Sequence, residues 1–159
     1  MTFRLRKDFR DAAALRRAEP RDYVVINDLA TALVGFAAER RRAFEAVLAH
    51  ADHDVIVAEI AGEAVGFAHL LTYQDLSHGA LAGELLELVV AQHMRGQGIG
   101  TALLREVWRR AKARGVRELH INTEPDNEAA RRLYVRFGAK VVGVQMELSV
   151  GDTTQKGMD

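Results

Sequence analysis

The sequence contains no cysteine and only two prolines among its 159 residues. Without cysteine the chain has no disulfide, no thiolate metal site and no cysteine nucleophile. No apolar run approaches the roughly 20 residues that a membrane-spanning helix needs. Residues 1–10 alternate charged and apolar types, unlike the continuous apolar core of a signal peptide. We therefore expect a cytoplasmic protein that does not enter a membrane.

The chain also has no net charge, because 22 Lys and Arg residues balance 22 Asp and Glu residues. A dedicated nucleic-acid-binding protein usually has a large basic excess, so this class is not expected. The balance conceals blocks of one sign. Residues 43–94 hold 8 acidic and no basic residues, whereas residues 95–117 hold 7 basic residues and 1 acidic residue. As a hypothesis, the basic block attracts an anion and the acidic block attracts a cation.

Hydrophobic periodicity predicts strands and helices along the whole chain. The expected strands are 13–17, 54–60, 64–73, 84–90, 116–123 and 142–150, with a polar loop at 74–83. The expected helices are one from Pro20 to Gly35, one over 39–51, one over 101–114, and one from Pro125 to Phe137. This order predicts an α/β fold with a mixed central sheet and helices on both faces. We expect a single domain over residues 1–159, with a core at about 12–150, an extension at 1–11 and a loose tail at 151–159.

A glycine-rich loop lies between an expected strand and an expected helix. Its residues are Arg95-Gly96-Gln97-Gly98-Ile99-Gly100-Thr101. Alternate glycines expose consecutive backbone N–H groups, and the N-terminus of the next helix adds more, which suits a phosphate or pyrophosphate. The loop lacks the lysine of a P-loop, and no glycine register matches the dinucleotide pattern G-x-G-x-x-G/A. The other interpretation is a structural turn.

Arg95-x-x-Gly98-x-Gly100 resembles the R/Q-x-x-G-x-G/A acyl-CoA motif of the GCN5-related N-acetyltransferase (GNAT) family. The resemblance continues through Gly115, the strand at 118–123 and the pattern Asn127-x-x-Ala130-x-x-Leu133-Tyr134-x-x-x-Gly138, and it covers about residues 12–150. It implies the acyl-CoA N-acyltransferase fold, in which acetyl-CoA lies where a splayed parallel strand pair separates, here the strands at 84–90 and 116–123.

The resemblance also implies which residues contact acetyl-CoA. The loop N–H groups would bind the pyrophosphate, the end of the strand at 84–90 would pair with the pantetheine arm, and one N–H there would polarise the acetyl carbonyl. Asn127 matches the family asparagine that contacts the cofactor arm. The expected cofactor-binding residues are Leu88, Val89, Val90, Arg95, Gly96, Gln97, Gly98, Ile99, Gly100, Thr101 and Asn127.

Tyr134 matches the family tyrosine that protonates the leaving CoA thiolate. Judged from its helix alone, it would be a packing residue beside Leu133 and Phe137, and its spacing of seven residues from Asn127 favours the catalytic role.

Glu87 lies in the strand before the loop, where family members often have a carboxylate. A glutamate in an apolar strand is costly unless it has a partner, so Glu87 is either the base, commonly acting through water, or a carboxylate paired with an arginine or placed at the cleft rim. Strict alternation puts Glu87 on one face with Leu85 and Val89, and Glu84 on the other.

Two positions depart from the family pattern. Asn122 stands where ribosomal-protein N-terminal acetyltransferases of this family have a glutamate base, which weakens that assignment. Gly138-Ala139 replaces the frequent Gly-Phe, as in some polyamine and aminoglycoside acetyltransferases, which suggests a small cationic acceptor.

His50, Asp52, His53 and Asp54 form a cluster of residue types that bind metals. The cluster has no H-E-x-x-H motif and no cysteine, so we expect a solvated helix end and no metal site.

These features predict an enzyme that moves the acetyl group of acetyl-CoA directly to the amine of a small cationic acceptor. Direct transfer within a ternary complex is expected because no cysteine can carry the acetyl group. The alternatives are a protein acetyltransferase acting on lysine or on an N-terminus, and a non-catalytic acyl-CoA-binding module. The sequence further allows a homodimer through the last strand, and neither nucleic acid nor a membrane is an expected partner.

Overall fold

The computed structural model describes residues 13–147. Contacts divide the chain into two compact units, of which the first ends at Ile121 and the second begins at Asn122. The expected single domain over residues 1–159 stays a prediction. The expected extension at 1–11 and the expected tail at 151–159 lie outside the described residues.

The first unit is built around a mixed five-stranded sheet in the order β1-β2-β3-β4-β5. The strands are β1 (Ala14–Arg17), β2 (His53–Ile60), β3 (Glu63–Asp75), β4 (Ala80–Val90) and β5 (Glu118–Ile121). Strands β1 to β4 pair antiparallel with one another, whereas β5 runs parallel to β4. A helix joins β4 to β5, as a parallel pair requires a crossover.

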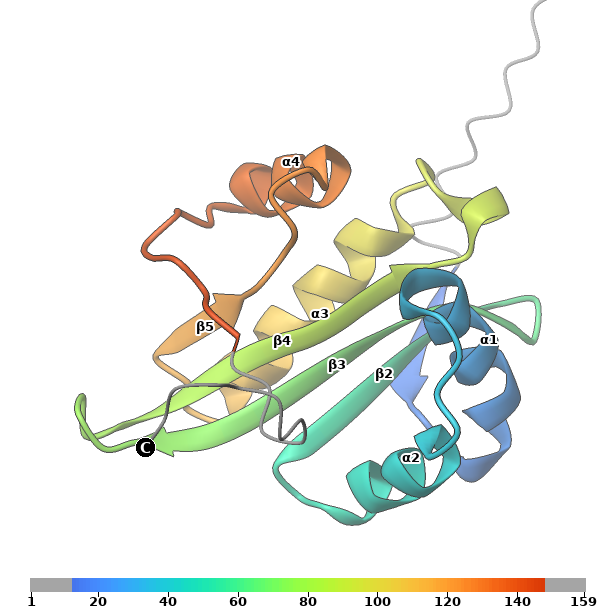
Figure 1. Ribbon diagram of the computed structural model, residues 1–159, viewed down its shortest axis with the longest axis horizontal. Coiled ribbons are helices and arrows are strands. Elements are labelled where there is room, and N and C mark those ends of the chain that lie inside the picture. The colour runs from blue at the N-terminus through green and yellow to red at the C-terminus, as the bar shows by residue number, and fades with distance from the viewer. Residues whose placement is uncertain (1–12, 148–159) are drawn as a thin grey trace, which may run out of the picture. The chain divides into compact units, whose positions relative to one another are not determined.

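Helices cover both faces of this sheet, as the sequence predicts (Figure 1). A 3-10 turn, η1 (Pro20–Asp22), leads into α1 (Tyr23–Val34), which is followed by α2 (Arg40–Ala49), and α3 (Ile99–Ala113) lies on the other side of the sheet. Residues of α1 and α2 pack against alternate residues of β2, β3 and β4, and this side of the sheet is the α1/α2 face. Its buried core contains Ile26, Ala30, Phe44, Val55, Val57, Phe67 and Val89.

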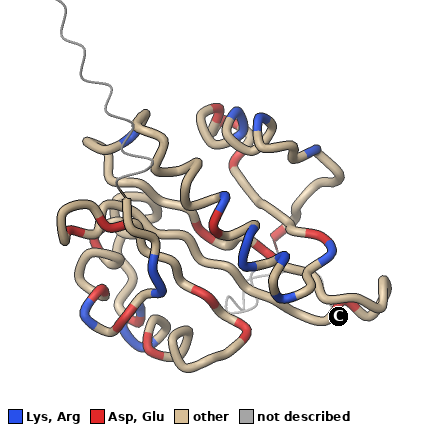
Figure 2. Tube along the Cα trace, turned by 180° about the vertical axis from the view of Figure 1, so that it is seen from behind, with Lys and Arg blue, Asp and Glu red and all other residues tan. Residues whose placement is uncertain are grey.

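The opposite side of the sheet is the α3 face. Apolar residues of α3 recur at helical spacing and are buried there, among them Leu103, Leu104 and Val107. Figure 2 shows the molecule from the side opposite to Figure 1, with the basic residues along α3 in blue. Arg110 and Arg114 donate hydrogen bonds to the Asp54 carboxylate of β2 at 2.8 and 3.4 Å, which anchors the helix to the sheet.

Strand β4 contains a bulge at Leu86. The partners of Glu87 and Leu85 on β3 are the consecutive residues His69 and Leu70, so Leu86 is an extra residue with no partner. An extra residue reverses the alternation of side chains beyond it. Glu87 therefore lies on the α1/α2 face and Leu85 on the α3 face, so the prediction that they share a face is wrong.

The segment at 74–83, predicted as a polar loop, is mostly strand. The β3–β4 ladder continues to the pair Asp75 and Ala80, which leaves only a four-residue turn between the strands. The Asp75 carboxylate accepts the backbone N–H groups of Ser77 and His78, and Gly79 has a positive φ of 57°. These contacts stabilise a tight turn, so the two strands continue through most of the segment that was predicted as a loop.

The second unit contains α4 (Glu128–Phe137). The Asn127 side chain accepts the N–H of Ala130 at its start, and Gly138 ends it with a φ of 109°. Residues 142–147 form no strand, so the predicted strand at 142–150 is wrong for this part, and residues 148–150 lie outside the described chain. A strand needs a ladder partner, and the part of the second unit up to residue 147 contains no other strand.

Candidate active site

The glycine loop follows a 3-10 turn, η2 (Gln92–Met94), and leads into α3. Gly96 and Gly98 have φ angles of 74° and 85°, in the left-handed region that favours glycine. Gly98 is the N-cap of α3, and because it has no side chain it cannot cap the helix itself. The Gly98 carbonyl accepts the N–H of Ala102, so the N–H groups of residues 98–101 precede the helical hydrogen bonds.

The polar side chains of this loop stabilise its own backbone. Arg95 Nε donates to the Val90 carbonyl at 3.1 Å, and Gln97 Nε2 donates to the His93 carbonyl at 3.2 Å. A Cβ atom added to Gly96 would meet nothing within 4 Å, so the loop surface is open at that point. An open loop with N–H groups at a helix N-terminus fits the pyrophosphate of an acyl-CoA.

Strands β4 and β5 pair only over part of β4. Their parallel ladder ends at the pair Leu85 and Ile121, whereas β4 continues to Val90. Leu88 and Val90 therefore lie in a stretch of β4 that β5 does not cover. The parallel pairing thus stops where the family resemblance places the pantetheine arm.

Val89 has its carbonyl against β3. A Cβ atom on Gly66 would come within 2.8 Å of the Val89 carbonyl oxygen, so this contact requires a glycine. The assignments of Leu88, Val89, Val90 and the loop residues as cofactor contacts stay predictions.

Three side chains form a hydrogen-bonded row on the α1/α2 face, across three neighbouring strands. His53 Nδ1 lies 2.8 Å from His69 Nε2, and His69 Nδ1 lies 3.2 Å from Glu87 Oε2. The His69 side chain is 9% exposed and that of Glu87 is 43% exposed. The row therefore runs from an accessible carboxylate through a buried ring. Within residues 13–147 the hydrogen-bond partner of Glu87 is a histidine, and the role of Glu87 as the base or as a carboxylate at the cleft rim stays a prediction.

A second polar group lies farther along the same face. The pairing of β4 with β3 and β5 aligns Glu84 with Leu71 and His120, and the Tyr73 hydroxyl lies 3.0 Å from His120 Nδ1. Burial raises the pKa of Tyr73, and the carboxylates of Glu84 and Asp75 add to the effect. Since Glu84 and Glu87 share this face, the prediction that Glu84 faces the other way is wrong.

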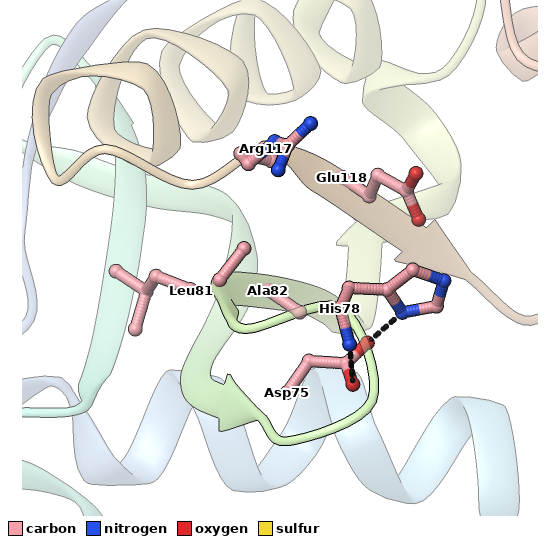
Figure 3. Close-up of a pocket in the computed structure, with 7 residues that line it drawn as sticks. Asp75, His78, Leu81, Ala82, Arg117 and Glu118 are labelled. Carbon is pink, nitrogen blue, oxygen red and sulfur yellow. Dashed lines mark hydrogen bonds and ion pairs between the residues drawn. The ribbon is translucent and has the colours of Figure 1, made fainter.

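A small cavity of about 80 Å³ lies at the turn between β3 and β4, at the opposite end of β4 from the glycine loop. Asp75 and His78 point toward one another beside Arg117 and Glu118 (Figure 3), and the His78 Nδ1 atom is 2.6 Å from Asp75 Oδ2. This pairing lowers the pKa of Asp75 and raises that of His78. The pair stabilises the hairpin turn.

The expected solvated cluster at residues 50–54 is wrong for two of its members. Asp54 is buried on the α3 face, where it pairs with Arg110 and Arg114, whereas His53 bonds to His69 on the α1/α2 face. Alternation along β2 separates the two side chains, since neighbouring residues of a strand point to opposite faces. Within residues 13–147, no group of three or more His, Asp or Glu side chains could hold a metal ion.

Tyr134 and Asn127 belong to the second unit. The Asn127 side chain caps α4, and burial raises the pKa of the Tyr134 phenol. A raised pKa keeps the phenol protonated at neutral pH, as a proton donor to a thiolate must be. Their roles beside acetyl-CoA stay predictions.

The model of the acetyltransferase (GNAT) family matches residues 12–139. The chain belongs to this family. Among curated relatives, N-alpha-acetyltransferase 30 of Schizosaccharomyces pombe is 41% identical over 66 residues, which cover 41% of this chain and 44% of the relative. Aminoalkylphosphonate N-acetyltransferase of Salmonella typhimurium is 38% identical over 79 residues, which cover 50% of this chain and 51% of the relative. The matches thus span about half the length of these relatives or less.

Solved structures show the same fold over most of the GNAT chain. Glucosamine-6-phosphate N-acetyltransferase from Arabidopsis thaliana has a TM-score of 0.75 at 20% identity, covering 87% of this chain and 98% of its own. Ribosomal-protein-alanine N-acetyltransferase from Brucella melitensis has a TM-score of 0.74 at 22% identity, covering 87% and 99%. Family membership implies acetyl-CoA as the co-substrate. No helix of the part that the structure describes is long and apolar enough to cross a membrane.

Sequence reasoning missed His69. It stands in the middle of a strand whose neighbours Ala68 and Leu70 are fully buried. A buried polar side chain nearly always has a hydrogen-bond partner, so a histidine within an apolar strand signals a partner on the adjacent strands.

Proposed function

We propose that this GNAT protein transfers the acetyl group of acetyl-CoA directly to the amine of a small cationic acceptor. The observation that carries the proposal is the shared face of Glu84 and Glu87, in the strand that leads into the glycine loop. Two carboxylates on one face, in a segment without Lys or Arg from residue 43 to residue 94, favour a positively charged ligand.

The chemistry requires the acceptor amine to lose a proton before it attacks, because a primary amine has a pKa of about 10. Glu87 takes this proton, directly or through a water molecule. The free amine then attacks the thioester carbonyl, while a backbone N–H near Val89 or Val90 stabilises the developing oxyanion. The carbon–sulfur bond breaks, and Tyr134 gives its proton to the CoA thiolate.

The choice of a small acceptor rests on this chain and not on its relatives. The relatives named above are called acetyltransferases of an N-alpha amine, an aminoalkylphosphonate, glucosamine 6-phosphate and a ribosomal protein. Because these names differ in their acceptors, they do not indicate one acceptor for this chain. The acidic segment of residues 43–94 and the Gly138-Ala139 pair support a small cation.

A thiol-release assay with acetyl-CoA tests the proposal over a panel of polyamines, aminoglycosides, aminoalkylphosphonates, lysine peptides and N-terminal peptides. We expect thiol release with polyamines or aminoglycosides, and at least tenfold less with the peptides. The Glu87→Gln variant serves as the control for enzyme-dependent release. Release with peptides alone would establish a protein acetyltransferase instead, and acetyl-CoA binding without release on any amine would establish a binding module.

A further inference from the structure

We propose that His69 and His53 are positioning residues for Glu87. In this arrangement His53 fixes the tautomer of His69, and His69 holds the Glu87 carboxylate in place to receive the proton of the acceptor. The inference rests on the proposed function, since it assigns a task to the base of that reaction.

The geometry restricts the His69 ring from both sides. Its two nitrogen atoms lie 2.8 Å from His53 Nδ1 and 3.2 Å from Glu87 Oε2, and its side chain is 9% exposed. Rotation of the ring would break both hydrogen bonds inside a buried environment, where unpaired polar groups are costly. The ring therefore provides a fixed anchor for a carboxylate that is itself accessible.

The chemistry of the partners fixes the direction of the hydrogen bonds. An ionised carboxylate can only accept, so the proton lies on Nδ1 of His69, which donates to Glu87. Nε2 of His69 then has a free lone pair and accepts from Nδ1–H of His53. Both rings are neutral in this arrangement. Burial lowers the pKa of His53, with further contributions from His69 and His50, which favours the neutral form.

The groups that face this row come from several elements. His50, at the end of α2, has its ring 6.1 Å from that of His53, and Asp52 precedes β2. Glu84 lies on the same face of β4. The strand residues among these neighbours include no Lys or Arg. The arginines of α2 on this side have other partners, since Arg40 donates to the side chains of Asn27 and Thr31 in α1. Arg41 stacks on the ring of Tyr23. The hydrogen bond from His69 is thus the contact that orients the Glu87 carboxylate from β3.

The proton step balances with Glu87 as its acceptor. One N–H bond of the acceptor ammonium breaks, its electron pair stays on nitrogen, and the proton binds the carboxylate, directly or through one water. His69 keeps its own proton on Nδ1 throughout. It acts by holding one carboxylate oxygen so that the other is presented to the acceptor.

The test compares His69→Asn with His69→Phe, using acetyl-CoA and the best amine of the panel. An asparagine amide keeps an N–H donor near the place of Nδ1 but cannot titrate, whereas phenylalanine keeps the ring shape and has no donor. We expect His69→Phe to lower kcat at least tenfold, with an unchanged KM for acetyl-CoA. The KM for the amine should change less than threefold, because a positioning contact acts on the proton step and not on amine binding. His69→Asn should keep kcat within threefold of the wild type.

A wild-type kcat in His69→Phe would overturn the inference, and so would equal losses of kcat in both variants. If His69→Phe does not fold, His53→Phe takes its place, since His53 is less buried. That variant should lower kcat at least threefold, because His69 can then adopt the tautomer without Nδ1–H. An unchanged kcat in His53→Phe would also overturn the inference.

A measurement without activity separates this inference from the proposed function. Nitrogen-15 NMR of the imidazole rings distinguishes the two neutral tautomers, and we expect Nδ1–H for both His53 and His69 at neutral pH. The Nε2–H tautomer at His69 would overturn the inference whatever the enzyme acetylates. The expected tautomers, together with no thiol release on any amine, would overturn the proposed function alone.

Discussion

Glu84 and Glu87 project from the same face of β4, although an unbroken strand would place them on opposite faces. Their partners on β3 are Leu71 and His69, and the extra residue Leu86 brings the two carboxylates into line. Both carboxylates therefore lie on the α1/α2 side of the sheet. This raises the question of which one removes the proton and which one attracts the cation.

Glu87 is expected to be the base, because His69 orients it and because it lies nearer to the glycine loop along β4. Glu87→Gln should lower kcat at least tenfold, within the range of about 10²–10⁴ that general base catalysis contributes, and leave the KM for acetyl-CoA unchanged. Glu84→Gln, the matched control, should mainly raise the KM for the amine. Steady-state kinetics measures both, and a larger loss of kcat in Glu84→Gln would reverse the two roles.

Tyr134 is expected to protonate the CoA thiolate. Tyr134→Phe keeps the ring and removes only the hydroxyl, so kcat should fall at least tenfold while CoA binding, measured by calorimetry, stays the same. Tyr23→Phe is the control, because Tyr23 packs against Phe44 in the core of the other unit. Unchanged turnover in Tyr134→Phe would show that this tyrosine is a packing residue.

The sequence predicted the order of elements up to α4, because long periodic segments such as the one around Leu103 and Val107 carry a strong helical signal. It failed where the outcome depends on pairing between strands. A bulge such as the one at Leu86 arises from the register with β3, which alternation within β4 does not reveal. Residues 142–147 alternate well and still form no strand, since alternation supplies no ladder partner.

In the candidate site, too, local features were predictable and contacts between strands were not. The loop at Gly96 and Gly98 was predictable, because the motif is local and its glycines have the positive φ angles that such a loop needs. The link from His53 to Glu87 through His69 was not, because it joins residues of three strands. Only the fold brings them within hydrogen-bond distance.

Gly98 should be essential for acetyl-CoA binding. Gly98→Ala places a side chain at a φ of 85° in the loop, with a strain of roughly 1–2 kcal/mol, and tilts the N–H groups at the start of α3. We expect the affinity for acetyl-CoA to fall at least tenfold by calorimetry. Gly115→Ala is a matched control, since Gly115 has a φ of 83° just beyond the other end of the helix. Equal losses of affinity in both variants would mean that the effect is general destabilisation.

The affinity for acetyl-CoA should fall with salt, but only modestly. Residues 95–117 carry the basic block, yet Arg110 and Arg114 pair with Asp54, and Arg109 pairs with Glu106. These partners neutralise part of the charge along α3. From 50 to 300 mM salt, roughly the range over which screening shortens to below 10 Å, we expect the Kd to rise about two- to fivefold. A Kd that does not change with salt would show that the basic block does not contribute to acetyl-CoA binding.

Glu106 should make the fold sensitive to acid. Its carboxylate accepts from Arg109 and Arg110 within α3, and these hydrogen bonds lower its pKa from 4.5 to about 2. A lowered pKa in the folded state means that the stabilisation is complete above the ordinary pKa of 4.5 and is lost as the pH falls toward 2.

Glu106→Gln tests this by urea unfolding at several pH values. At pH 7 the variant should be less stable by roughly 1–3 kcal/mol, because the glutamine keeps a hydrogen-bond acceptor but not the charge. The difference from the wild type should shrink as the pH is lowered from 5 toward 2, since the wild-type carboxylate is then protonated as well. Glu128→Gln provides the contrast, because Glu128 is 74% exposed where it pairs with Arg132, and such pairs contribute about 0–1 kcal/mol. A stability difference for Glu106→Gln that stays constant with pH would show that the effect comes from packing and not from the charge.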